Sequence, residues 1–199
     1  MDKNDILHKL KKLKAQQQAV DAKWKESANI DMLKFFVEII PRALNVERCS
    51  IFIADPKLDS VWLQCGTNVP ERSINVPRDN SLVGDVVSSG KLLIAEDLEE
   101  RMGAHYEVSM KTGFQPRDTL IVPIIGLATK KVTGAIQVLN KRTSKREDVY
   151  EKDDIELLKK MAMHIQMSIE NIFIRQELSK LSYAMSQQIK KLEGHLKAS

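Results

Sequence analysis

The fold class is decided at residues 49–54, which read Cys49-Ser50-Ile51-Phe52-Ile53-Ala54. Here the hydrophobic pattern changes from a helical period to the period of two that is typical of a strand. Asp55-Pro56-Lys57 follows with the residues of a tight turn. The next apolar run, Val61-Trp62-Leu63-Gln64-Cys65, ends at Gly66 and has the composition of a partner strand. The sequence therefore predicts an antiparallel hairpin at this point.

Downstream of the hairpin, short strands alternate with helical segments. A short helix is expected over residues 81–89, entered through Asn80 or Ser81 and stopped at Gly90. Residues 99–111 have a mixed pattern that is helical in part. Further strands are expected at residues 73–76, 92–95, 119–125 and 132–139, the last two joined by a turn at 126–131. Neighbouring strands in this order pair mainly antiparallel, which indicates an α+β fold with helices packed on one sheet.

Amphipathic helices flank the strands on both sides. Residues 29–44 carry an apolar face, with Asn29 as the expected N-cap and Pro41 as a point where the helix bends or ends. The last helix is expected to begin at Val149 or Tyr150 and to run for about 45 residues, or nearly 70 Å at 1.5 Å per residue. Its apolar positions step by three and four: Ile155, Leu158, Ala162, Ile165, Ile169 and Ile172, then, after a shift of phase, Ile174, Leu178, Leu181, Met185, Ile189, Leu192 and Leu196.

The two ends of the chain have the pattern of coiled coils. Alternating steps of four and three make a heptad seam near the N-terminus, at Ile6, Leu10, Leu13, Gln17, Val20 and Trp24. A small domain cannot cover a helix of 70 Å, so the outer half is expected to pair with the N-terminal arm, a second copy, or both. The predicted organisation is an N-terminal helical arm (1–28), a central domain (29–175) and a C-terminal coiled-coil extension (176–199), with a homodimer formed through the terminal helices.

Composition and charge exclude several classes of function. The net charge of +4 comes from the two helical ends, and no basic patch with interleaved aromatic residues indicates a nucleic-acid partner. No apolar run is long enough to cross a membrane, and no secretory signal is present, so a cytoplasmic protein is expected. Cys49 and Cys65 form no zinc or disulfide pattern, and no metal cluster is expected. The chain has no phosphate-binding glycine-rich loop and no Gly-x-Ser-x-Gly motif, so we do not expect an enzyme.

Three segments of the chain together resemble a GAF domain. They are residues 49–55, residues 81–90 (Ser81-Leu82-Val83-Gly84-Asp85-Val86-Val87-Ser88-Ser89-Gly90) and residues 134–141 (Gly134-Ala135-Ile136-Gln137-Val138-Leu139-Asn140-Lys141). Asn140-Lys141 with Tyr150 and Asp154 is similar to the Asn-Lys…Phe-x-x-x-Asp-Glu signature of the family. The closest likeness is to the regulatory GAF domains of cyclic-nucleotide phosphodiesterases and cyanobacterial adenylate cyclases. The resemblance implies a GAF-like central antiparallel sheet, two helices behind it and a lidded pocket in front.

The resemblance also implies a set of site residues. Ser50 would lie on the pocket floor, Leu82 and Val83 would present backbone groups to a ligand, and Thr112 and Thr119 would supply hydroxyl groups. Tyr106 or His105 would cover the ligand from the lid. The family's two base-reading carboxylates align here with Cys65 and Gln137. Outside the pocket, a structural clamp would tie the last strand to the long helix through Asn140, Lys141, Tyr150 and Asp154.

These features together predict a regulatory domain that senses a small molecule and transmits through paired helices in signal transduction. Gln137 can still donate and accept hydrogen bonds. A cysteine cannot replace a carboxylate that faces a guanine edge, so Cys65 disfavours cyclic GMP as the ligand. Cyclic AMP, another nucleotide, another small metabolite and an empty pocket stay open. A fused or separate signalling domain would read the output. The alternative is a dimerisation or interaction module that binds no ligand.

Overall fold

The strands form one antiparallel sheet. The structure, a computed structural model, describes residues 31–55, 59–70, 73–100, 108–110, 112–143 and 148–174. Within these residues six strands pair in the order β3-β2-β1-β6-β5-β4, and every neighbouring pair is antiparallel. This confirms the predicted α+β class. The strands are β1 (Val46–Ala54), β2 (Ser60–Gly66), β3 (Asn75–Pro77), β4 (Leu93–Ala95), β5 (Thr119–Ile125) and β6 (Val132–Lys141).

The two central strands, β1 and β6, are the longest and approach each other closely. Ile53 of β1 pairs with Gly134 of β6. A Cβ atom on Gly134 would lie 2.2 Å from the carbonyl oxygen of Phe52. Glycine is therefore needed at this position to let the backbones meet. Strand β1 begins three residues before the predicted start at Cys49, and it includes the polar pair Glu47 and Arg48.

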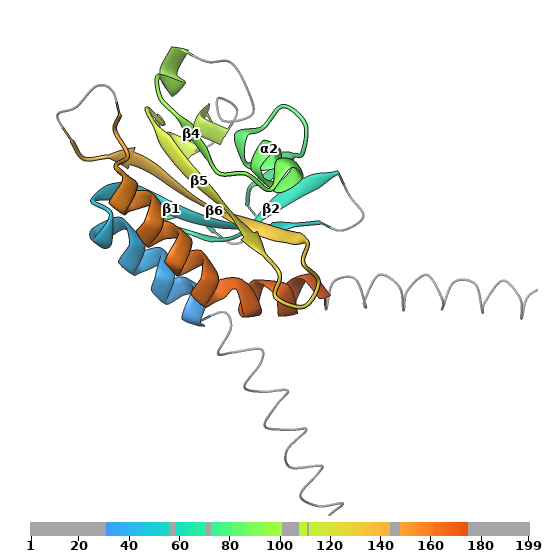
Figure 1. Cartoon of the computed structure of the whole chain (residues 1–199). Coiled ribbons are helices and arrows are strands. Elements are labelled where there is room, and N and C mark those ends of the chain that lie inside the picture. Colours follow the sequence, from blue (N-terminus) through green and yellow to red (C-terminus); the bar gives the residue numbers. More distant parts are fainter. Residues whose placement is uncertain are drawn as a thin grey trace, which may run out of the picture.

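Two helices cover one face of the sheet, which we call the back face (Figure 1). The helical residues 31–43 and 152–174 lie side by side across β1 and β6. The first helix continues through residue 43, past the predicted bend at Pro41, whose ring is buried. Helices and strands meet in one apolar core, with Leu33, Ile40 and Leu44 from the first helix, Ile51, Ile53, Ile136 and Val138 from the strands, and Leu158, Ile165 and Ile169 from the second helix.

Helix α2 (Leu82–Ser89) lies over the opposite, front face. Its ends match the predicted capping residues. The Ser81 hydroxyl accepts a hydrogen bond from the Gly84 N–H at 3.0 Å, and Gly90 closes the helix in the left-handed conformation with φ 67°. The helix rests directly on the chain before it, because a Cβ on Gly84 would lie 2.1 Å from the Arg78 carbonyl oxygen. A 3-10 turn, η1 (Leu98–Glu100), follows β4.

Several expectations fall on other parts of the chain. The N-terminal arm at residues 1–28, the extension at 176–199 and the lid residues His105 and Tyr106 lie outside the described residues. Among the described residues, the helices are too short or too polar to cross a membrane.

Candidate functional site

A small cavity lies between the front face of the sheet and helix α2. Strands β1 and β6 form its floor, and α2 together with Ile74 and Val76 forms its walls. Its other side is bordered by Val108, Ser109, Thr112, Phe114 and Pro116. Its free volume is about 80 Å³. The lining is mainly apolar: Phe52, Val69, Ile74, Val76, Leu82, Val83, Leu98, Val108, Phe114, Pro116 and Leu139. The polar members are Arg48, Ser50, Ser81, Ser109, Thr112 and Gln137.

Five of the predicted ligand-binding residues line this cavity: Ser50, Leu82, Val83, Thr112 and Gln137. Ser50 and Gln137 are paired across β1 and β6, so their side chains share the front face. The Thr112 hydroxyl donates to the Val108 carbonyl oxygen at 2.8 Å. The Gln137 amide nitrogen donates to the Thr119 hydroxyl oxygen at 3.3 Å, which leaves the Gln137 carbonyl oxygen as an acceptor.

Thr119 and Cys65 do not line the cavity. The Thr119 side chain is fully buried and its hydroxyl donates to the Val138 carbonyl oxygen at 2.8 Å, so it acts as a support for Gln137. Cys65 pairs with Ile51 and packs against the back-face core. The register between β1 and β2 shifts at Ile51/Phe52, and this irregularity decides which β2 side chains face the front. The argument against cyclic GMP that rests on Cys65 therefore has no support from its position.

The sequence analysis missed most of the remaining cavity residues, among them Arg48 and Phe114. Arg48 lies two residues before Ser50 on the same strand, and the guanidinium carbon is 3.8 Å from the ring centroid of Phe114. A period of two on β1 places Arg48, Ser50 and Phe52 on one face. This alternation could have identified Arg48 from the sequence, but the predicted strand began at Cys49 and so excluded it.

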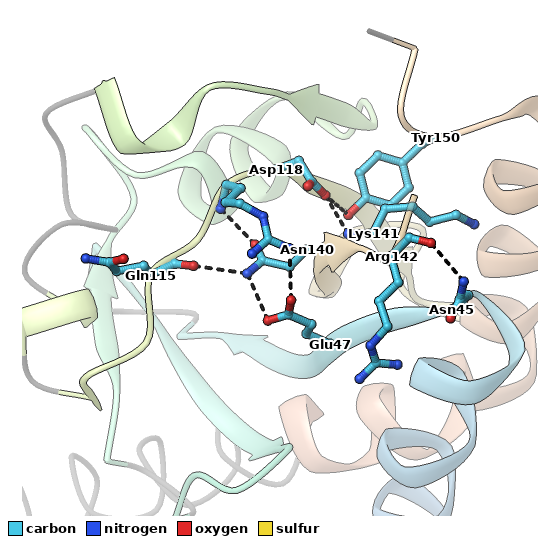
Figure 2. A network of polar contacts seen from close by, with 9 residues as sticks. Asn45, Glu47, Gln115, Asp118, Asn140, Lys141, Arg142 and Tyr150 are labelled. Atoms are coloured by element: carbon cyan, nitrogen blue, oxygen red, sulfur yellow. Dashed lines mark hydrogen bonds and ion pairs between the residues drawn. The ribbon is translucent and has the colours of Figure 1, made fainter. Parts of the chain in front are cut away.

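A polar network holds the segment beside the cavity against β6 (Figure 2). Asn140 adopts a positive φ of 58° at the end of β6. Its side chain donates to the carbonyl oxygen of Gln115 at 3.0 Å and accepts from the N–H of Arg117 at 2.7 Å. Its amide also donates to Glu47 at 3.1 Å, and Glu47 forms an ion pair with Arg117 at 2.8 Å. Asn140 therefore fixes the backbone on both sides of Pro116, which lines the cavity.

The same network reaches both helices of the back face. Asp118 accepts from the Tyr150 hydroxyl at 2.7 Å and from the Lys141 N–H at 2.9 Å. The Lys141 ammonium group contacts Asp154 at 2.5 Å and the carbonyl oxygen of Leu44 at 2.8 Å. Asp154 lies near the start of the second helix, and Leu44 follows the last helical residue of the first. One lysine therefore joins the last strand to both helices.

Burial and hydrogen bonds shift the pKa values of these groups. Burial raises the pKa of the Tyr150 phenol strongly, and the neighbouring Asp118 raises it further. Burial also raises the pKa of Glu47, but the hydrogen bonds from Asn140 and Arg117 outweigh it, so the net shift is downward. Burial lowers the pKa of the Arg48 guanidinium, opposed by the charge of Glu47. Tyr150 is therefore a neutral donor and Glu47 a carboxylate acceptor at neutral pH.

The described residues contain no cluster of His, Cys, Asp and Glu that could hold a metal ion. Burial raises the pKa of the Cys49 thiol well above its ordinary value, so Cys49 is a poor nucleophile. Hydrogen-bond donors and acceptors in an apolar cavity can recognise a small molecule without a metal ion or a reactive thiol.

Comparisons with known proteins agree with this architecture. A sequence model of the GAF domain family matches residues 30–169. No curated protein matches the chain. Among solved structures, the GAF domain of a phosphoenolpyruvate-protein phosphotransferase from Coxiella burnetii is similar with a TM-score of 0.61 and 17% identity, over 74% of this chain and 85% of that one. Its counterpart from Acinetobacter gives a TM-score of 0.57 and 18% identity, over 72% and 82%.

Two further structures widen the range of proteins that share the fold. The GAF domain of a two-component sensor histidine kinase from Bacillus halodurans gives a TM-score of 0.53 and 16% identity, over 72% of this chain and 97% of that one. A free methionine-R-sulfoxide reductase from Thermoplasma acidophilum gives 0.57 and 8%, over 75% and 96%. At these identities the likeness shows the fold alone. The match of the family model over most of the described residues, together with the sheet and flanking helices that it implies, establishes that the chain belongs to the GAF domain family.

Proposed function

We propose that the chain is a regulatory GAF domain that binds a small molecule in the front cavity and transmits its presence to the two back-face helices. GAF domains occur as modules of signalling and sensing proteins. The observation that carries the proposal is that one pair of strands, β1 and β6, forms both the cavity floor and the surface on which the helices pack. Ser50 faces the cavity, while its neighbours Cys49 and Ile51 lie in the helix-facing core.

The polar network supports the same coupling by a second route. Residues Phe114 and Pro116 border the cavity, and Asn140 binds the backbone of this segment. Lys141, the next residue, contacts Asp154 and the Leu44 carbonyl group. A ligand that moves the segment at 114–118 would therefore act on a lysine that holds both helices. Two packed elements with alternative arrangements are what such transmission requires.

The cavity volume favours a ligand smaller than a nucleotide. An apolar cavity of about 150 Å³ accepts a benzene-sized molecule, and drug-sized ligands occupy roughly 300–1,000 Å³. The free volume here is about 80 Å³. A cyclic nucleotide would therefore need an outward movement of α2 or of residues 112–116, whereas a molecule of a few heavy atoms would not.

Ligand binding is tested by native mass spectrometry of the freshly purified chain, followed by thermal unfolding with each candidate molecule. A ligand that binds the folded state raises the melting temperature by mass action. Ser109→Trp is expected to fill the cavity and abolish this shift, because Ser109 lines it. The matched control is Met110→Trp at the next position, whose side chain is 72% exposed. A ligand-induced shift that survives Ser109→Trp would place the binding site elsewhere.

An exposed apolar surface on the back-face helices supports the second candidate, a dimerisation module. Phe35, Met163 and Met167 are 55%, 64% and 61% exposed, and Ile39 lies one turn after Phe35. Met163 and Met167 are in phase with Ile174, eleven residues after Met163, and with the heptad positions beyond it. We propose a second copy as the partner, since such a seam is self-complementary about a two-fold axis.

Sedimentation of the whole chain tests the dimer. Met163→Glu with Met167→Glu is expected to weaken the dimer, because it places four carboxylates in one symmetric interface. Met163→Leu with Met167→Leu keeps the surface apolar and is expected to leave the dimer intact. If the wild-type chain is a monomer, the dimerisation module is ruled out. If it is a dimer that no ligand stabilises, the dimerisation module is favoured over the sensor.

A further inference from the structure

The cavity contains one charged side chain among its described lining residues, and it is a cation. The other polar members are hydroxyl groups and the amide of Gln137, and no described carboxylate lines the cavity. Arg48 reaches it from β1, where it pairs with Leu139 of β6. Among the described residues, the local environment of a bound molecule is therefore apolar with a single positive charge.

The Arg48 guanidinium has hydrogen-bond donors to offer. Its described contact is with the face of the Phe114 ring, at 3.8 Å, and a ring face uses none of its N–H groups. Glu47, its neighbour in the sequence, is occupied by Arg117 and by the amide of Asn140. Within the described part of the chain, no carboxylate forms an ion pair with Arg48.

A partly buried guanidinium that has no ion pair with a described carboxylate is an incomplete arrangement. Removing the charge from water has a cost that a hydrogen-bonded anion offsets. Arginine binds carboxylates through two parallel N–H···O bonds, which adds geometric selectivity. The contact with Phe114 restricts the guanidinium before any ligand arrives, so the two bonds can form with a smaller loss of side-chain freedom.

We propose that the cavity takes a small organic carboxylate, whose charged end binds the Arg48 guanidinium and whose short apolar body contacts the side chains of Val83 and Leu139. This inference rests on the proposed sensing function and names its ligand class. The size follows from the free volume of about 80 Å³. The apolar body follows from the lining, since a bare inorganic anion would leave those side chains without a partner. The Gln137 carbonyl oxygen and the Ser50 hydroxyl lie on the floor for any second polar group.

The position of Phe114 links recognition to the polar network. Phe114 precedes Gln115, whose carbonyl oxygen accepts from Asn140. A carboxylate that draws Arg48 toward itself changes the contact between the guanidinium and the ring. Ligand binding would therefore displace first the segment at 114–118, which Asn140 and Asp118 hold, and then Lys141.

The test compares matched acids and amides on the whole chain by NMR titration of its backbone amides. The probes are propionate and butyrate, with propionamide and butyramide as neutral partners of the same shape. We expect the acids to bind roughly tenfold or more tightly than the amides, the range expected for a charge-assisted hydrogen bond in place of a neutral one. Shifts should concentrate on residues of β1, β6 and α2.

Three variants assign any preference to Arg48. Arg48→Met keeps the apolar stem and is expected to abolish the preference for acids, whereas Arg48→Lys keeps the charge and is expected to retain part of it. Arg42→Gln removes an equal charge from an exposed position on the first helix and is expected to change nothing. Amides that bind as tightly as acids, or a preference that survives Arg48→Met in a folded protein, would overturn the assignment.

The outcomes separate this inference from the proposed function. If a neutral molecule co-purifies and stabilises the protein through the cavity, the sensor stands and the carboxylate assignment fails. If nitrate or phosphate binds but neither propionate nor butyrate does, the ligand does not need an apolar body and that part of the proposal is overturned. If no probe binds and no molecule co-purifies, both proposals fail together and the dimerisation module remains.

Discussion

The two faces of the sheet differ in how completely they are packed. On the back face, side chains of β1 and β6 such as Ile51 and Ile136 are fully buried against two helices. On the front face, the same strands present Ser50, Gln137 and the guanidinium of Arg48 to a cavity. Because strand residues alternate between faces, one pair of strands supplies both a dry core and a polar floor. Stability should therefore depend more on the back face than on the side chains that line the cavity floor.

Removing a large side chain from each face of β6 gives the sharpest test of this difference. Ile136→Ala is expected to lower the free energy of unfolding by about 2–5 kcal/mol, because the side chain is fully buried. Leu139→Ala is expected to lower it by about 1 kcal/mol, since this side chain already faces open volume. Urea denaturation measures both. Equal losses in the free energy of unfolding would contradict the idea that the back face contributes more to stability than the cavity floor.

The attachment of the back-face helices to the end of β6 is tested at Lys141. Lys141→Met leaves Asp154 without its cation and should cost about 3 kcal/mol, because the pair is largely buried. The double variant Lys141→Met with Asp154→Leu is expected to recover part of this loss, since no lone charge remains. Denaturation of the four proteins in the cycle gives the coupling energy. A coupling near zero would mean that the contact does not hold the helices.

The elements that the sequence predicted correctly are those whose signals are local. Strand β5 was expected at residues 119–125, as observed, because apolar residues fill it and turns bound it. Helix α2 was found from Ser81 and Gly90, whose roles depend only on local geometry. Strand β1 was predicted too short because Glu47 and Arg48 look like loop residues. Their hydrogen bonds and ring contact come from Asn140, Arg117 and Phe114, far along the chain.

The site was predictable only where it follows the strand period. Ser50 and Gln137 share a face by register, and both line the cavity. Cys65 was placed there by alignment, but a register irregularity beside Phe52 assigns it to the other face. A shift of one residue reverses the direction of every side chain beyond it. Such irregularities depend on packing between strands and leave no local signal.

A smaller effect is expected at Tyr150, which joins the network just before the second helix begins. Tyr150→Phe should lower the free energy of unfolding by about 1–2 kcal/mol, because Asp118 loses one buried donor. Burial and Asp118 raise the phenol pKa above its ordinary value of 10.0. The contribution is therefore complete below pH 10.0 and is lost as the pH rises through the folded-state pKa. Unfolding measured from neutral to alkaline pH should show a steeper decline in wild type than in Tyr150→Phe.

The smallest expected effect lies at the other end of the second helix, where Glu170 joins it to the β5–β6 turn. Its carboxylate accepts from the N–H groups of Ala128 and Thr129, at 3.1 and 2.7 Å. Burial raises the pKa of Glu170, but these bonds outweigh it and the net shift is downward. Stability from Glu170 is therefore complete above its ordinary value of 4.5 and is lost as the pH falls through the lowered value. Glu170→Gln should cost about 1 kcal/mol at neutral pH and flatten the acid limb of the stability profile. An unchanged acid limb would mean that the back-face helix is held to the turn by apolar packing alone.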